Sequence, residues 1–286
     1  EIGMDFLDPE ARRLLKAAGA DVRDGEPRVR LDRGLVETAI ASAPAEFRLH
    51  ARNPAHNLTF GGDHVIFAQV ASAPNCSDAL AGRRPGSQED FRRLVKLAQA
   101  FNIIHMTGGY PVEPVDLHAS IRHLEWLRDL ATLTDKAFHC YSLGRERNRD
   151  ALEIARIARG IDAATLEREP SLISVINSSS PLRLDAPMLQ GIMEMSARGQ
   201  VIIMTPFTLA GAMAPVTIAG ALAQQNAEAL AGIAFTQIVR PGAPVVYGGF
   251  TSNVDMRTGA PAFGTPEYMQ AAMVGGQLAR RYRLPY

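Results

Sequence analysis

Three short apolar runs lie in the middle of the chain: KAFHCYSL (136–143), SLISVINSSS (171–180) and QVIIMTPF (200–207). Between them lie two amphipathic segments, RDALEIARIARG (149–160) and APMLQGIMEMSARG (186–199), the second behind Asp185 as a predicted cap. Short, continuously apolar runs are typical of strands buried on both faces, and segments of about 12 residues with a helical period are typical of crossover helices. This alternation predicts consecutive βαβ units with a parallel sheet.

The same cycle extends in both directions. Upstream lie a helical segment at 88–101, the run NIIHMTGGY (102–110) and a helix at 117–134 with Asp116 as its expected cap. Downstream lie a long helix at 216–239, the run PVVYGGF (244–250) and a helix after Thr265. Right-handed crossovers curl five such units into a barrel or a doubly wound sheet. Because no GxGxxG or P-loop follows any strand, we favour an α/β fold of the TIM-type (β/α)8 barrel class, incomplete in this chain.

The first 87 residues have a different pattern. Residues 1–46 are predicted to be helical, with Asp8 and Pro9 starting the segment 6–20. Short alternating segments follow at 47–53, 57–62 and 64–70, which favours antiparallel strands. We therefore expect an N-terminal helical and antiparallel β appendage over residues 1–87. Barrel units one to five would occupy residues 88–286, with the remaining units after Tyr286 and the chain truncated at both ends.

Composition excludes some partners. Lys plus Arg and Asp plus Glu are both 30, so no overall field attracts nucleic acid or an anionic membrane. No stretch approaches the roughly 20 apolar residues that span a bilayer. The two cysteines, Cys76 and Cys140, form no metal-spaced cluster and favour a reduced, cytoplasmic protein.

The carboxyl ends of the predicted strands would gather the active site, as in other barrels. These ends are rich in hydroxyl, amide and aromatic groups, and we find no Ser-His-Asp order, paired carboxylates or HExxH among them. His105 and His139 fall inside strand patterns, where hydrogen-bonded core histidines are the alternative to ligands. Four aromatic side chains could surround a cation or simply pack, and three polar ones could hold the rest of a ligand. The candidates are Tyr110, Phe207, Tyr247 and Phe250, with Asn177, Asn253 and Asp255.

Two long motifs resemble the trimethylamine methyltransferase family. They are LAGAMAPVTIAGALAQQNAEALAG (209–232) and GGFTSNVDMRTGAPAFGTPEY (248–268), and FRLHARNP (47–54), AGRRPGS (81–87) and the segment through TDKAF (134–138) are also similar. The resemblance covers nearly the whole chain. It implies a TIM-type barrel with a further C-terminal portion. The pyrrolysine of archaeal members would lie after Tyr286, and we expect a bacterial, non-pyrrolysine member.

The resemblance also implies the chemistry. A methyl group would move from a quaternary or tertiary amine to the cobalt of a corrinoid (cobalamin) protein. The corrinoid would be supplied by that partner, with no cofactor or metal bound directly and no catalytic acid or base required, because the released amine is neutral. Glycine betaine, carnitine-like betaines, proline betaine and trimethylamine stay open as substrates, and a homo-oligomer stays open as the assembly.

Two other functions compete with this one. A barrel lyase or aldolase would need a Schiff-base lysine or a metal cluster at a strand end, but Lys96 and Lys136 both precede their strands. A betaine-binding barrel without turnover would keep an aromatic cage and lack methyl transfer.

Overall fold

The computed structural model of the chain describes residues 2–286. Within that range the chain forms nine α-helices and many short strands, divided between two compact units. Unit 1 comprises the residues up to Glu46, with Ser142–Arg145 and Val175–Tyr286. Unit 2 comprises Phe47–Tyr141 and Glu146–Ser174. The fold is mixed α/β with parallel strand pairs, as the alternating pattern predicted.

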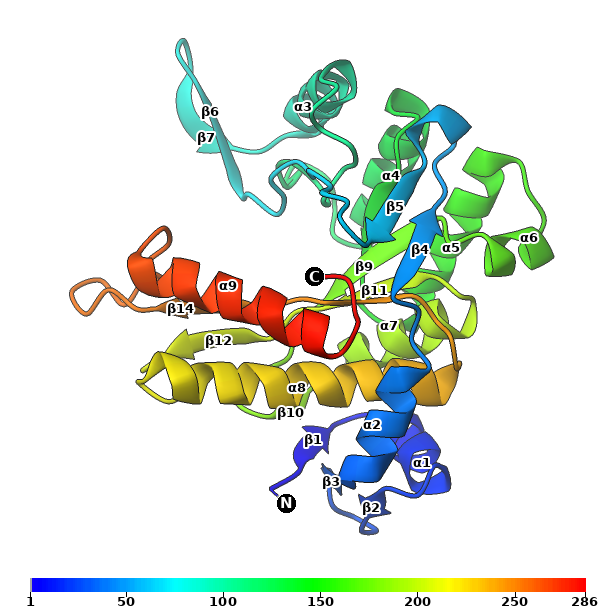
Figure 1. Ribbon diagram of the computed structural model, residues 1–286. Helices are drawn as coiled ribbons and strands as arrows, with labels where there is room; N and C mark the ends of the chain where they lie inside the picture. Colours follow the sequence, from blue (N-terminus) through cyan, green and yellow to red (C-terminus); the bar gives the residue numbers. More distant parts are fainter. Residues whose placement is uncertain (1) are drawn as a thin grey trace. The chain divides into compact units, whose positions relative to one another are not determined.

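Two parallel strand pairs organise unit 1. Strand β11 (Val201–Met204) pairs with β13 (Val245–Tyr247), and β12 (Phe207–Ala210) pairs with β14 (Phe250–Asn253). Val and Ile dominate β11 and β13, as expected for strands covered on both faces. The β12–β14 pair lies between helices α8 (Ile218–Val239) and α9 (Pro266–Arg281), as Figure 1 shows.

Helix α8 is the central helix of unit 1. It carries apolar or small residues on every face, and Ala219, Ala223 and Ala227 form an exposed stripe along an otherwise mostly buried helix. It contacts α2, α7 and α9 as well as the strands. The side chain of Phe235 on this helix meets the edge of Phe6 with ring centroids 5.8 Å apart, and both rings are fully buried. The core of unit 1 therefore extends from α8 to the first residues of the chain.

The N-terminal segment is only partly helical. Helix α1 begins after Asp8, whose carboxylate accepts from the backbone N–H groups of Glu10 at 2.8 Å and Ala11 at 3.1 Å. That predicted cap is confirmed. The prediction of an all-helical segment over residues 1–46 is wrong, because three short strands form an antiparallel sheet there and β1 also pairs in parallel with β10. These strands of two or three residues are too short to carry a period.

Unit 2 holds a second set of parallel contacts. Ala68 forms a parallel bridge with Met106, and Met106 forms one with Ala137 just before β8 (Phe138–Tyr141). The expectation of an antiparallel strand at 64–70 is therefore wrong. The Ser174 hydroxyl in β9 (Leu172–Ile176) donates to the Cys140 carbonyl in β8 at 2.9 Å.

Helix caps test the predicted helix starts. Asp185 accepts from Met188 N–H at 2.9 Å, which confirms that predicted cap, and α9 begins after Thr265, where the sequence predicted a helix. Asp116 does not cap the helix that follows it, because that helix begins at Arg122 without a side-chain cap. Its carboxylate instead accepts from Gln88 N–H at 2.9 Å, at the first residue of α3.

The remaining elements are short strands and helices of up to 15 residues. Closure of the strands into a barrel, and the division of the chain at residues 87 and 88, stay predictions. In unit 1 these elements are β1 (Met4–Phe6), α1 (Pro9–Ala17), β2 (Asp21–Val22), β3 (Arg28–Arg30), α2 (Arg33–Ala41), β10 (Arg183–Leu184) and α7 (Ala186–Ala197). In unit 2, apart from the first residues of β4 and α5, they are β4 (Glu46–Leu49), the 3-10 turn η1 (Pro54–His56), β5 (Leu58–Gly61), β6 (Asn75–Asp78), β7 (Gly82–Pro85), α3 (Gln88–Ala100), α4 (Arg122–Leu133), α5 (Arg145–Arg159) and α6 (Ala163–Arg168).

Candidate functional site

The carboxyl ends of three strands lie at one level in unit 1. Thr205 N–H donates to the Ile176 carbonyl at 2.8 Å, and Gly248 N–H donates to the Met204 carbonyl at 2.9 Å. The segments that leave β9, β11 and β13 therefore start side by side. Asn177 is the first residue after β9, and its side chain is exposed.

Two of the predicted aromatic side chains meet directly. Phe207 and Phe250 are register partners in β12 and β14, and their rings stack with centroids 4.7 Å apart and planes 10° from parallel. Both are half-buried. A cation held between two ring faces would need centroids roughly 8–10 Å apart, since each ring attracts it from within about 6 Å. The pair therefore offers one aromatic wall.

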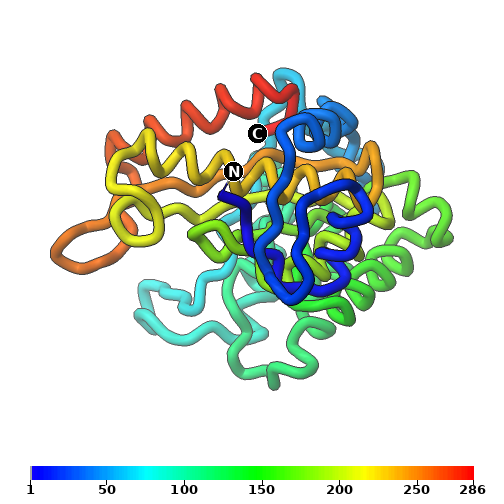
Figure 2. The backbone as a smooth tube through the Cα atoms, turned by 90° about the horizontal axis from the view of Figure 1, so that it is seen from below, coloured from blue at the N-terminus to red at the C-terminus, as the bar shows by residue number. Residues whose placement is uncertain are grey.

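Two further aromatic side chains extend this wall. Phe263, in the loop before α9, meets Phe250 edge-on at 5.2 Å and is 58% exposed. Tyr268, in the first turn of α9, lies 6.3 Å from Phe250 and 5.9 Å from Phe263. The loop that carries Phe263 extends beyond the ends of β14 and α9 (Figure 2). The sequence offered no signal for these two contacts beyond their place in the motif at 248–268.

A buried polar group lies behind the stacked rings. Thr208 and Thr251 are register partners whose hydroxyls are hydrogen-bonded, and Thr251 donates to Gln225 Oε1 on α8 at 2.6 Å. A Cβ atom at Gly249 would lie 2.4 Å from the same glutamine amide. Only glycine leaves room for Gln225 there, so the amide holds the start of β14 in place.

Tyr247 lies in a separate cluster in unit 1. Its side chain is fully buried, its hydroxyl donates to Asn226 Oδ1 at 3.1 Å, and burial raises the pKa of its phenol. Asn226 in turn donates to the Tyr282 hydroxyl at 3.0 Å. The ring centroids of Tyr282 and Tyr286 lie 6.2 Å and 6.4 Å from that of Tyr247. The predicted contact of Tyr247 with a substrate stays a prediction.

Asn253 and Asp255 both form local contacts. Asn253 Oδ1 accepts from the Thr265 hydroxyl at 2.8 Å. Asp255 is exposed, accepts from Arg257 N–H at 2.9 Å and from the Thr258 hydroxyl at 2.9 Å, and these bonds hold the pKa of its carboxyl below the usual range. These contacts stabilise the turn after β14, and the predicted substrate roles of both residues stay predictions.

Tyr110 belongs to an aromatic cluster in unit 2. Its ring lies 4.5 Å from Tyr141 and 6.0 Å from Trp126. The Tyr141 hydroxyl is hydrogen-bonded to the Ser72 hydroxyl at 2.6 Å, and burial raises the pKa of that phenol to about 12. The Tyr141 hydroxyl also accepts a long bond of 3.3 Å from Tyr110 N–H. Tyr141 and Trp126 were absent from the predicted aromatic set.

The two histidines that fell inside strand patterns differ in burial, His139 being buried and His105 partly exposed. His139 is buried against the edge of Tyr141 at 4.7 Å, and burial lowers the pKa of its imidazole to about 3. His105 Nδ1 accepts from Phe67 N–H at 3.0 Å.

Glu113 pairs with Arg122 at 2.5 Å. No group of three His, Cys, Asp or Glu side chains within residues 2–286 is arranged to hold a metal ion.

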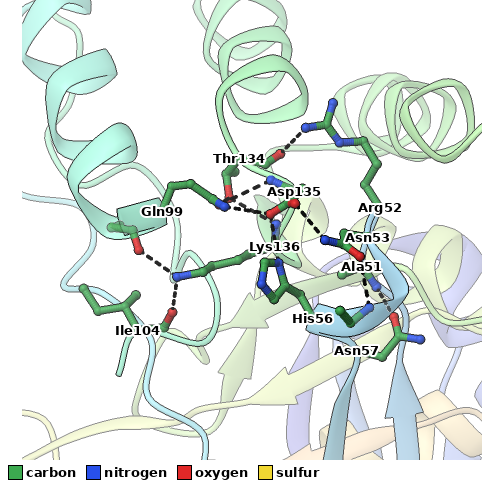
Figure 3. A network of polar contacts seen from close by, with 12 residues as sticks. Ala51, Arg52, Asn53, His56, Asn57, Gln99, Ile104, Thr134, Asp135 and Lys136 are labelled. Atoms are coloured by element: carbon green, nitrogen blue, oxygen red, sulfur yellow. Dashed lines mark hydrogen bonds and ion pairs between the residues drawn. The ribbon is translucent and has the colours of Figure 1, made fainter. Parts of the chain in front are cut away.

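Lys136 sits in the polar network drawn in Figure 3, just before β8. Its ammonium is buried and donates to the carbonyls of Ala98, Phe101 and Ile104 at 2.9, 2.9 and 2.6 Å. The neighbouring Asp135 accepts from Gln99 at 2.7 Å and from His56 at 2.8 Å. These bonds tie the end of α3 to the start of β8, so Lys136 is a capping group and offers no free amine for a Schiff base.

Small organic molecules commonly bind at the carboxyl ends of parallel strands that carry hydroxyl, amide and aromatic groups. The sequence model of the trimethylamine methyltransferase family matches residues 1–286. The chain therefore belongs to the trimethylamine methyltransferase family.

Three curated relatives show the range of that family. A glycine betaine methyltransferase of Desulfitobacterium hafniense strain Y51 is 39% identical over 285 residues, which is 100% of this chain and 59% of the relative. A trimethylamine methyltransferase from another strain of that species is 27% identical, covering 99% of this chain and 57% of the relative. One from Methanosarcina barkeri is 29% identical, covering 99% and 58%. The chain thus spans less than three fifths of the length of these relatives. None of the helices in residues 2–286 has the length and apolar character needed to cross a membrane.

Proposed function

We propose that this chain is part of a methyltransferase that moves a methyl group from glycine betaine, or a closely related methylated amine, to the corrinoid of a partner protein. The observation that carries the proposal is the aromatic wall of Phe207, Phe250, Phe263 and Tyr268 beyond the ends of β11 and β13. The greater similarity to a glycine betaine methyltransferase than to the trimethylamine enzymes supports a betaine as the substrate.

The wall suits a methylated cation. A quaternary ammonium group spreads its positive charge over methyl groups and has no N–H to donate to polar acceptors, so aromatic faces bind it better than polar side chains do. Each such contact contributes about 0.5–2 kcal/mol, depending on desolvation. Asn177 and Asn253 are then the candidates for the polar remainder of the substrate, and Asp255, a carboxylate, would suit only its cationic end.

The proposed reaction requires little acid–base catalysis by the residues of this chain. The leaving group is a neutral amine, which departs without a proton, so the chain's own residues bind and orient the donor. The reduced corrinoid of the partner protein supplies the nucleophile that accepts the methyl group. Because the partner would carry that group, none of this chain's residues is assigned to it.

The test is transfer itself. Purified protein is mixed with glycine betaine, carnitine, proline betaine or trimethylamine, with and without a reduced corrinoid protein, and demethylated amine is followed by proton NMR. We expect turnover of a betaine only in the presence of the corrinoid protein. Demethylation without corrinoid would reject the proposal, and tight betaine binding with no transfer to any corrinoid partner would favour a non-catalytic betaine-binding barrel.

A site variant makes the test specific. Phe250→Leu keeps an apolar side chain but removes the ring, and we expect KM for the betaine to rise about 2–30-fold, the equivalent of about 0.5–2 kcal/mol. Phe101→Leu is the matched control, because Phe101 is a half-exposed ring at the end of α3 in unit 2. Equal effects of the two substitutions on KM would argue against the aromatic wall.

A further inference from the structure

A buried carboxylate on α8 holds the segment that follows β9. Glu228 is fully buried, and its Oε2 accepts from the hydroxyls of Ser178 and Ser180, the second at 2.7 Å. Its Oε1 accepts from Leu182 N–H at 2.8 Å and from Gln224 Nε2 at 2.9 Å. All four donors that the structure describes are neutral.

Burying an ionised carboxylate is costly unless its lone pairs are satisfied. Here both oxygens are bonded twice, and hydrogen bonds to an ionised acceptor are stronger than bonds between neutral groups. Three of the donors, Ser178, Ser180 and Leu182, belong to one five-residue stretch. The carboxylate therefore fixes this stretch at three points.

The fixed stretch contains a residue in a costly backbone conformation, and its Leu182 carbonyl also accepts from Asp5 N–H at 2.9 Å. Leu182 has a positive φ of 51°, a left-handed conformation that costs free energy for a residue with a branched side chain. Its N–H is bonded to Glu228, and Ser179 N–H donates to the Arg183 carbonyl at 2.8 Å. Asn177 stands between this stretch and the end of β9, so the direction of Asn177 depends on it.

We propose that Glu228 is a positioning residue for the substrate's carboxylate: by fixing residues 178–182 it sets Asn177 so that its amide donates to the carboxylate of a betaine. This rests on the proposed function. The trimethylammonium end binds the aromatic wall, and the carboxylate end requires a donor held at a set distance from it. A methylated cation without a carboxylate does not use that donor.

The test compares two buried glutamates. Glu228→Gln replaces one carboxylate oxygen with an NH2 group, which cannot accept a hydrogen bond, so either the two serines or Leu182 N–H and Gln224 lose their acceptor. Glu194→Gln is the control, because Glu194 on α7 is also buried but is paired with Arg145 at 2.5 Å and Arg198 at 2.6 Å. We measure hydrogen exchange over residues 177–182, and binding of glycine betaine and of tetramethylammonium by calorimetry, each on the intact protein.

For Glu228→Gln we expect exchange at the Leu182 amide to rise about tenfold or more and the Kd for glycine betaine to rise about tenfold. The Kd for tetramethylammonium should stay within about twofold of the wild-type value. Glu194→Gln should leave the exchange of residues 177–182 and the betaine Kd unchanged. Equal weakening of both ligands, or unchanged exchange in Glu228→Gln, would overturn the proposal.

Failure of the proposed function and failure of the Glu228→Gln variant to fold can each be told apart from failure of this inference. Wild-type protein that binds no methylated amine would overturn the proposed function and the substrate part of this inference, and the exchange data would still decide whether Glu228 fixes the loop. If Glu228→Gln does not fold, Ser180→Ala removes one donor from the same carboxylate. It should reproduce the selective loss of betaine binding to a smaller extent, and unchanged betaine binding in that variant would count against the proposal.

Discussion

Gly109→Ala should be among the most disruptive single-methyl additions in unit 2. Gly109 has a φ of +137°, and a Cβ atom there would lie 2.2 Å from the Tyr141 hydroxyl oxygen and 3.1 Å from the Ala71 Cβ. A residue other than glycine in this backbone region costs about 1–3 kcal/mol. Displacing Tyr141 also breaks its 2.6 Å bond to Ser72, for about 0.5–1.5 kcal/mol more. We therefore expect a total loss of about 2–4 kcal/mol.

The clash can be separated from the backbone strain. Gly160 also has a positive φ, of 65°, but nothing lies within 4 Å of a Cβ atom built there. Gly160→Ala should therefore show strain alone, about 1–2 kcal/mol. Tyr141→Phe removes the oxygen at 2.2 Å and leaves the ring carbon at 2.9 Å, so it should relieve part of the effect of Gly109→Ala.

The assay is urea unfolding of the wild type, the two glycine variants, Tyr141→Phe and the double variant. We expect Gly109→Ala to exceed Gly160→Ala by about 1–2 kcal/mol, and Tyr141→Phe to offset about 1 kcal/mol of the loss. Additive effects of Gly109→Ala and Tyr141→Phe would refute the clash with the hydroxyl. Equal losses at Gly109 and Gly160 would show that backbone strain accounts for everything.

Three further outcomes follow from buried polar groups. Because burial lowers the pKa of His139 to about 3, the native state excludes a proton that the unfolded chain binds below about pH 6.5. The free energy of unfolding should therefore fall by about 1.4 kcal/mol per pH unit from about pH 6.5 downward. When unfolding midpoints are measured between pH 7 and pH 5, His139→Gln should show a shallower acid slope than the wild type. An equal slope would contradict this. Lys136→Met removes three bonds to carbonyls and should cost about 1.5–3 kcal/mol by urea unfolding, whereas the exposed Lys96→Met should cost almost nothing. Tyr247→Phe leaves Asn226 Oδ1 without its 3.1 Å donor and should cost about 1 kcal/mol by thermal unfolding while KM for the amine stays within about twofold; a large rise in KM would mean that the hydroxyl contacts substrate.

Local pattern predicted the elements that are long and periodic. The strands at Val201–Met204 and Val245–Tyr247 and the helix Ile218–Val239 fall where the apolar runs and their caps placed them. Each of these signals depends on neighbours within a few residues, such as the Asp185 and Thr265 caps. Propensity and capping act at that range, so the sequence alone is sufficient for them.

Pairings between distant residues could not be predicted in the same way. The strand Met4–Phe6 pairs with Arg183–Leu184, about 180 residues away in sequence. The β12–β14 pair consists of four-residue strands that begin at Phe207 and Phe250, the last residues of the two predicted runs, and neither has a clear period. Asp116 has the sequence position of a cap for the helix that follows it. Its carboxylate instead accepts from Gln88 N–H, a residue distant in sequence that lies beside it in the folded chain.

The same contrast between local signals and long-range pairing applies to the candidate site. The strand ends grouped Phe207 and Phe250 as candidates, and the two rings do meet, because the carboxyl ends of parallel strands share an edge. Their stacking, and the edge contacts of Phe263 and Tyr268, depend on the register of β12 with β14 and on the path of the loop between them and α9. No spacing rule in the sequence encodes that register.

Helix α8 holds the segments around the candidate site in fixed positions. Over five consecutive positions it supplies Gln224, Gln225, Asn226 and Glu228, which bond the segments around three neighbouring strand ends. A wall that binds a methylated cation by weak contacts of about 0.5–2 kcal/mol gains most from being fixed beforehand, because any ordering on binding would consume a similar free energy. The stacked rings are held by a threonine pair and a buried amide behind them, so the positions of the two half-buried rings are set before any ligand binds. Under the proposed function, the long motif at 209–232 supports the binding surface, and the motif at 248–268 contributes Phe250, Phe263 and Tyr268 to it.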